Sequence, residues 1–184
     1  MDTLHFLSWN VQGLGGQAFR RVKGLLRSDL GSSTVGIIDI LFLQEHHLCM
    51  DRIRKYGSIL PGRWTHFWVP AFGPNGHQAG LCIAIRQQLE SNIVSTTTTM
   101  NKRAQFLILK RESQKVGLMN LYAPNSASKR ADLSLSLFDY ADLADCWLVG
   151  GDYNMIEDVA DRLGGIGTTI LGWEAKCWDY FCFS

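Results

Sequence analysis

The chain has 184 residues, of which 46% are hydrophobic and 19% charged, a composition that fits one folded domain and excludes a disordered tail. Its 18 Lys and Arg side chains against 17 Asp and Glu give a net charge of +1, so any nucleic-acid contact must come from local basic patches. Five cysteines without a C-x-x-C pair argue against a disulfide framework and a structural zinc site.

The amino terminus, MDTLHFLSWN, lacks the basic segment and long apolar segment of a secretory signal. No apolar run is long enough to cross a membrane, so we expect no membrane partner. Together with the cysteine usage, this favours a reducing intracellular location, nuclear or cytoplasmic. We find no repeat, low-complexity tract or linker, and therefore expect residues 1–184 to belong to a single domain.

The apolar pattern of the first half predicts a strand, a helix and three more strands: Leu4–Trp9, Gln17–Ser28, Ile37–Glu45, 64–70 and 80–86. The glycine-rich stretch 13–16 separates the first strand from the helix. The second of these strands, Ile37–Glu45, ends in a carboxylate.

The second half continues with an edge strand, two paired strands, a helix, a strand and a weakly helical segment: 96–100, Ala104–Lys110, Lys115–Tyr122, Ser128–Leu143, Cys146–Val149 and Gly172–Cys182. A doubly wound parallel sheet needs helices between most strands, and the middle of the chain lacks them. The pattern therefore predicts an α/β sandwich of mostly antiparallel sheets with outer helices.

Polar side chains stand at or just beyond the ends of four apolar strands. Asn10 lies in LSWNVQG, Glu45 in LFLQEHH and Tyr122 in LMNLYAPN, while Asp152 and Asn154 follow two glycines in LVGGDYN. Strand ends on one side of a sheet can meet in one cleft, where binding sites commonly form. We therefore expect these five residues to form one site.

Taken singly, each residue also fits a structural role. Asn10 fits a turn, Glu45 an exposed strand end and Tyr122 a half-buried core aromatic before a strand stop. Asp152 and Asn154 fit a loop cap of the Asx type. Considered singly, the structural interpretation is favoured for Asn10 and Tyr122, whereas the set as a whole favours a functional one for Glu45, Asp152 and Asn154.

The motifs WNVQG, LQE, NLYAP and GGDYN, in this order, resemble those of the endonuclease/exonuclease/phosphatase superfamily, and the resemblance extends from Leu4 to about Gly165. VQGLGG, YAPN and DRLGG are most similar to its non-LTR retrotransposon branch. The resemblance implies a deoxyribonuclease-like sandwich and a metal-dependent phosphodiester hydrolase of endonuclease type that acts on DNA.

The resemblance also implies a role for each site residue. Glu45 is the main ligand of Mg²⁺ or Mn²⁺, Asn10 orders the metal shell, and Asp152 lies beside the metal and orients and deprotonates the attacking water. Asn154 and Tyr122 donate hydrogen bonds to the scissile phosphate. These roles suit the chemistry, because phosphodiester cleavage needs a cation that neutralises charge and donors for the developing oxyanion.

Four further predictions concern the surroundings of the site. We expect Gln44 to lie in the second layer around the metal. Neighbouring strand residues point to opposite faces, so His46 and His47 cannot both be metal ligands, and we interpret them as loop residues beside the site. His66 is expected at the surface or as a satisfied core histidine. If DNA binds, the phosphate contacts are expected among four basic residues: Arg20, Lys102, Arg103 and Lys129.

The sequence departs from the family pattern in one motif. The family ends with an Asp-His pair, whereas every histidine here lies at or before position 77. We therefore expect a domain that lacks its C-terminal portion, that has little activity alone, and whose fold another segment or chain completes. Two alternatives stay open: a non-catalytic remnant of a retroelement, and a member of the phosphatase branch.

Overall fold

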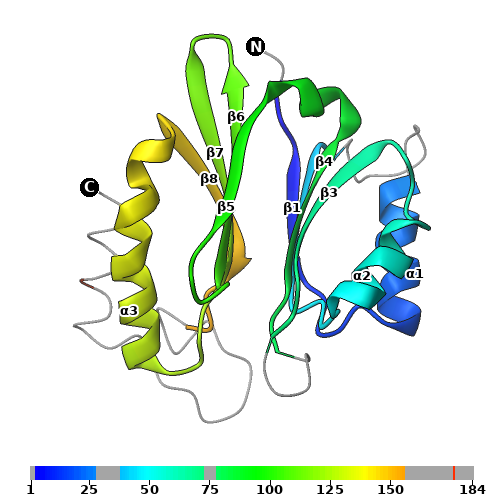
Figure 1. Cartoon of the computed structure of the whole chain (residues 1–184), viewed down its shortest axis with the longest axis horizontal. Helices are drawn as coiled ribbons and strands as arrows, with labels where there is room; N and C mark the ends of the chain where they lie inside the picture. Colours follow the sequence, from blue (N-terminus) through cyan, green and yellow to red (C-terminus); the bar gives the residue numbers. More distant parts are fainter. Residues whose placement is uncertain (1–2, 28–37, 73–77, 156–175, 177–184) are drawn as a thin grey trace.

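The structure, a computed structural model, describes residues 3–27, 38–72, 78–155 and 176. Two four-stranded sheets face each other, and helices cover the outer face of each sheet (Figure 1). The predicted α/β sandwich of mostly antiparallel sheets with outer helices is therefore confirmed. No helix in the described ranges is both long and apolar enough to span a bilayer.

The first sheet has the order β1-β2-β4-β3, with β1 (Phe6–Asn10), β2 (Ile40–Gln44), β3 (Trp64–Val69) and β4 (Leu81–Arg86). Among the described strand pairs of this sheet, β1–β2 is parallel, whereas β2–β4 and β3–β4 are antiparallel. The helices α1 (Gly16–Arg27) and α2 (Met50–Gly57) cover its outer face. Strand β2 is buried along its whole length because its side chains alternate between these helices and the second sheet.

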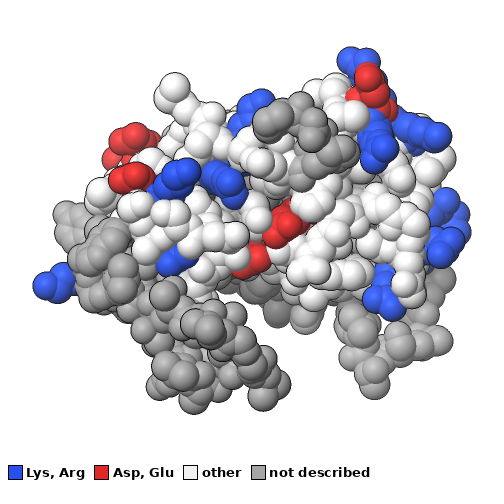
Figure 2. Space-filling model, turned by 90° about the horizontal axis from the view of Figure 1, so that it is seen from below, with Lys and Arg blue, Asp and Glu red and all other residues white. Residues whose placement is uncertain are grey.

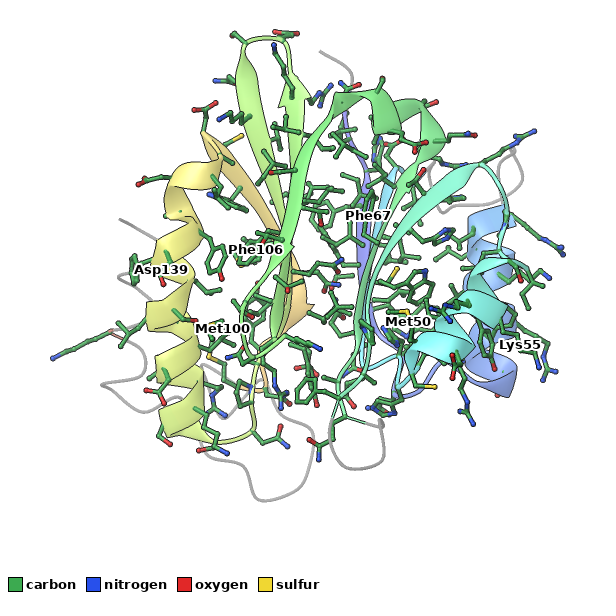
Figure 3. The ribbon with its side chains drawn as sticks, in the orientation of Figure 1. Met50, Lys55, Phe67, Met100, Phe106 and Asp139 are labelled. Carbon is green, nitrogen blue, oxygen red and sulfur yellow. The ribbon has the colours of Figure 1, made fainter. Side chains whose placement is uncertain are left out.

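The second sheet has the order β5-β6-β7-β8, with β5 (Ile93–Thr98), β6 (Ala104–Arg111), β7 (Gln114–Tyr122) and β8 (Cys146–Asp152). The 3₁₀ helix η1 (Gln87–Asn92) connects the two sheets. Strands β7 and β8 run parallel, and α3 (Ala127–Leu137) with the 3₁₀ helix η2 (Phe138–Leu143) forms the crossover between them. Phe106 packs against this crossover, whereas Phe67 of β3 packs between the sheets (Figure 3).

The two glycines before Asp152 permit close packing. A Cβ atom on Gly150 would come within 2.5 Å of the Phe42 ring, and one on Gly151 within 2.3 Å of the Leu121 carbonyl oxygen. Only glycine therefore fits at both positions without a shift. The pair lets β8 lie close to β2 and β7, which fixes the place of the Asp152 side chain.

The remaining differences from the predicted elements are local. Helix α2 was not predicted, because its eight residues, MDRIRKYG, bury only Ile53 and give no apolar period. The predicted edge strand at 96–100 begins earlier, at Ile93, and the predicted helix 128–143 divides into α3 and η2. Apart from Lys176, the predicted helical segment Gly172–Cys182 lies outside the described residues.

Candidate active site

The four strands that carry the predicted site residues end at the same edge of the sandwich. In the parallel pair β1–β2, Asn10 lies opposite Gln44, directly before Glu45. In the parallel pair β7–β8, Tyr122 lies opposite Asp152. Because parallel strands end on the same side, each sheet brings its polar strand ends to this edge. Figure 2 looks onto it: acidic side chains lie near the middle of the face, and basic side chains, together with further acidic ones, lie farther toward its margins.

Asn10 connects the carboxylates of the two sheets. Its Nδ2 donates to Glu45 Oε1 at 2.9 Å and to Asp152 Oδ2 at 2.6 Å. Its Oδ1 accepts from the backbone N–H of Gln12 at 3.0 Å. An amide N–H₂ offers two donors, so Asn10 satisfies one oxygen of each carboxylate and holds the carboxylates close together.

Asp152 and Asn154 form the turn that the structural interpretation predicted. The backbone N–H of Asn154 donates to Asp152 Oδ1 at 2.9 Å, and its Nδ2 donates to the Ala123 carbonyl at 2.7 Å. Both Asp152 oxygens are thus fixed by hydrogen bonds. The side-chain nitrogen of Asn154 bonds to the backbone here, so its donation to a phosphate stays a prediction.

Tyr122 points its phenol at the carboxylates. Burial, followed by a hydrogen bond to Glu45 and the negative charge of that group, raises the pKa of Tyr122 to about 12. The guanidinium of Arg103 lies over the Tyr122 ring at 4.9 Å and over the Phe72 ring at 5.2 Å. At neutral pH Tyr122 is therefore a protonated hydrogen-bond donor held in place on one side by a cation.

The loops of the site have an uncommon backbone conformation. Gln12, Glu45, His47 and Asn154 all have positive φ, at 46°, 54°, 54° and 49°. Among non-glycine residues this left-handed region is uncommon, and asparagine tolerates it best. Such conformations persist where the surroundings over-determine them, and they cluster at functional sites. The concentration of four around two carboxylates supports a functional interpretation of this edge.

Of the two histidines after Glu45, only His47 faces the site, where its Nε2 lies 3.2 Å from Glu45 Oε2. His46 is fully buried: its Nε2 lies 3.1 Å from the Val69 carbonyl, and its Nδ1 accepts from the Leu48 N–H. Both histidines lie in the loop after β2, as predicted, but the sequence did not predict that His46 is buried away from solvent. Its ring ties the loop that carries Glu45 to the first sheet.

Burial should make the protein sensitive to acid through two histidines. Desolvation lowers the pKa of His46 and of His66 to about 4 from the usual 6.5. Between these values the unfolded chain binds more protons than the folded one, so stability falls as the pH falls from about 6.5 toward 4. We expect a loss of about 2 kcal/mol per histidine between pH 7 and pH 5, measured by urea unfolding in EDTA.

The matched variants for this measurement are His66→Phe, which removes one titrating group, and His5→Gln at an exposed position. The first should reduce the acid-induced loss by about half and the second should leave it unchanged. Equal stability of the wild type at pH 7 and pH 5 would contradict the lowered pKa values of the two histidines.

The expectation that His66 is a surface or satisfied core histidine is wrong, because within the described part of the chain its buried Nε2 has no hydrogen-bond partner.

Gln44, predicted for the second layer around the metal, belongs to a buried network between the sheets, and its predicted place near a metal stays a prediction. Its Nε2 donates to Ser8 Oγ at 3.1 Å and to Asn120 Oδ1 at 2.6 Å. Asn120 Nδ2 donates in turn to the carbonyls of Leu43 and Cys82, each at 3.0 Å. The network joins β7 to β1, β2 and β4 directly behind the site. Asn120 was part of the NLYAP motif, but its sequence context gave no sign of this role.

The predicted phosphate-contacting residues come from three different parts of the fold. Lys102 and Arg103 occupy the turn between β5 and β6, and the Arg103 carbonyl accepts from the Tyr122 N–H at 2.8 Å. This turn therefore borders the site. Lys129 lies in the first turn of α3 and Arg20 within α1, both exposed.

The donor atoms at this edge suit a hard divalent cation. Mg²⁺ keeps several waters and takes one or two carboxylates, and Glu45 and Asp152 are the carboxylates that Asn10 holds together. The Glu45 side chain is 19% exposed, so solvent reaches part of it. Among the described residues no three acidic, His or Cys side chains surround one point, so Mg²⁺ held here would keep several of its waters.

Comparisons with known proteins agree with this fold. Residues 7–179 match the Endonuclease/Exonuclease/phosphatase family. A transposon TX1 uncharacterized 149 kDa protein of Xenopus laevis is 26% identical over 133 residues, which is 69% of this chain and 10% of that protein.

Among solved structures, the AP endonuclease LMAP from Leishmania major superposes with a TM-score of 0.69 at 16% identity, over 97% of this chain and 65% of that one. A humanized D. rerio TDP2 superposes with a TM-score of 0.57 at 20% identity, over 89% of this chain and 68% of that one. The chain thus spans about two thirds of these enzymes and a tenth of the transposon protein.

Proposed function

The chain belongs to the endonuclease/exonuclease/phosphatase family, and we propose that it is a metal-dependent phosphodiester hydrolase of the endonuclease type that acts on DNA. The observation that carries the proposal is the bridge from Asn10 to both Glu45 and Asp152, which unites residues 142 positions apart in sequence. Similarity to a transposon protein and to an AP endonuclease supports DNA as the substrate and a retroelement origin.

In this proposal Glu45 holds Mg²⁺ or Mn²⁺, with Asp152 beside it and Asn10 keeping the two carboxylates in place. A bound cation would neutralise charge on the phosphate and on the departing oxygen. Without the cation the two like charges repel while Asn10 donates to both, so the arrangement favours a positive charge between them.

Asp152 is the group that takes the proton of the attacking water. Its two oxygens already accept from Asn10 and from the Asn154 N–H, which orients the carboxylate and leaves lone pairs for a water. Tyr122, protonated at neutral pH, donates to an oxygen of the phosphate in place of Glu45. Asn154 is the second proposed donor, once its amide leaves the Ala123 carbonyl.

The test is nicking of supercoiled plasmid by an excess of the protein. One cut relaxes a plasmid molecule, so even slow cleavage is detected. Because the sequence lacks the family's Asp-His pair, we expect slow nicking that requires Mg²⁺ or Mn²⁺. Release of phosphate from phosphomonoesters without nicking would favour the phosphatase alternative. Metal binding without either activity would favour the non-catalytic alternative.

Binding of DNA should depend on salt through the basic residues near the site. Removing one phosphate contact should make the slope of log K against log[salt] shallower by about 0.9. We expect this change for Lys102→Ala, which is exposed beside the site, measured by fluorescence anisotropy in Ca²⁺. Lys115→Ala, at the opposite end of β7, is the charge-matched control and should not change the slope.

The same measurement on Arg20→Ala, Arg103→Ala and Lys129→Ala tests which of these three side chains also contact phosphate. Arg103→Ala should also weaken metal-dependent nicking, because its guanidinium holds the Tyr122 ring. Unchanged slopes for all four variants would place the DNA elsewhere on the surface or rule it out.

A further inference from the structure

His47 is placed to act on the same cation as Glu45. Its Nε2 lies 3.2 Å from Glu45 Oε2, while Glu45 Oε1 is already engaged by Asn10. The His47 side chain is 30% exposed, more than that of Glu45. The carboxylate therefore presents its remaining oxygen to an imidazole nitrogen at an accessible position.

The spacing of these two atoms suits two ligands of one ion. With metal–ligand bonds of about 2.1–2.2 Å, neighbouring ligands of an octahedral ion lie about 3 Å apart. The observed separation is close to this value and also fits a direct hydrogen bond. With the imidazole hydrogen on Nδ1, the Nε2 lone pair is free to bind a cation without release of a proton.

The position of the ring is fixed by its backbone. The His47 N–H donates to the Ala79 carbonyl at 3.1 Å, and its φ of 54° aims the side chain back toward Glu45. A Cβ atom on Gly13, which itself has a φ of 100°, would come within 3.4 Å of His47 Nδ1. Such a Cβ atom would be in ordinary contact with the ring, so the positive φ rather than the ring explains the glycine, while the backbone of His47 holds the ring beside the carboxylate.

We propose that His47 Nε2 is a second protein ligand beside Glu45 Oε2, and that the site for this reason binds Mn²⁺ more tightly than Mg²⁺. Mg²⁺ gains little from a nitrogen ligand, whereas Mn²⁺, the first and weakest member of the transition-metal affinity order, accepts a nitrogen beside its preferred oxygen ligands. The inference rests on the proposed metal-dependent function.

The matched variants are His47→Asn and His5→Asn. Asparagine tolerates the positive φ at position 47 and is too short to reach the position of Nε2. His5 is an exposed histidine directly before β1, at the opposite end of that strand from Asn10. Mn²⁺ binding is measured by the loss of the free-ion electron paramagnetic resonance signal, and Mg²⁺ binding by competition against bound Mn²⁺.

We expect His47→Asn to weaken Mn²⁺ binding about tenfold or more and Mg²⁺ binding less than about twofold, with no change for His5→Asn. In the wild type, electron spin echo modulation of bound Mn²⁺ should show an imidazole nitrogen, and this signal should vanish in His47→Asn. Absence of the nitrogen signal, or equal weakening of both metals, overturns the assignment. Binding that Glu45→Gln leaves intact would instead overturn the proposed metal site itself.

Discussion

Asn120→Leu should lower the free energy of unfolding by about 3 kcal/mol or more, although leucine fills a similar volume. Asn120 is fully buried, and its amide joins the two sheets through Gln44 and two backbone carbonyls. Leucine removes one of the two acceptors of the buried Gln44 N–H₂, while Ser8 Oγ remains, and it leaves the two carbonyls without this donor. Each buried polar group that loses a partner costs about 1–3 kcal/mol.

Urea unfolding at pH 7 measures this change, and Asn92→Leu is the matched control. Asn92 donates through the same atom to a backbone carbonyl, at 2.9 Å, but its hydrogen bond is exposed to water. Water replaces the lost bond there, so we expect a change below about 1 kcal/mol. Similar losses in the two variants would show that the buried network does not hold the sheets together.

Asp152→Asn should lower the rate of plasmid nicking by about 10²–10⁴-fold. Asparagine keeps the shape of the side chain but removes the charge and the basic oxygen that the proposed mechanism uses. It also brings an amide N–H₂ toward the Asn10 N–H₂ that now donates to Asp152 Oδ2. The change therefore acts on the proton acceptor and on the bridge between the sheets.

Asp139→Asn is the control for the loss of one negative charge, because Asp139 is exposed on η2, on the outer side of the second sheet (Figure 3). Its nicking rate should equal that of the wild type within about twofold. Asp152→Asn and Asp139→Asn should unfold at similar temperatures. The lower nicking rate of Asp152→Asn would then come from lost chemistry and not from lost structure. Undiminished nicking by Asp152→Asn would remove Asp152 from the mechanism.

Much of the fold could be predicted because its strands are buried on one or both faces. Strand β2 is apolar except at its last residue, and β6 and β7 flank a short polar turn, so the apolar pattern found them. Helix α2 escaped prediction because one buried isoleucine does not make a period. The glycines at 150 and 151 indicated close approach, but only the structure identifies Phe42 and Leu121 as what approaches.

The composition of the site could be predicted better than its internal contacts. Glu45, Asp152 and Asn10 stand at strand ends, and parallel pairing brings such ends together. The burial of His46 depends on the carbonyls of Val69 and Leu81, which come from distant strands. His47 approaches Glu45 because both residues have a left-handed backbone conformation. Residues other than glycine and asparagine seldom adopt this conformation, so the local sequence did not predict the contact.

Calorimetric titration of Mg²⁺ into the wild type and into Glu45→Gln tests the central claim most directly: that the strand ends of the two sheets form one cation site. The wild type should bind a single ion, and the variant, which keeps the shape of the side chain and loses its charge, should bind at least about tenfold more weakly. A wild type that binds no Mg²⁺, or equal affinity in the two proteins, would contradict the claim.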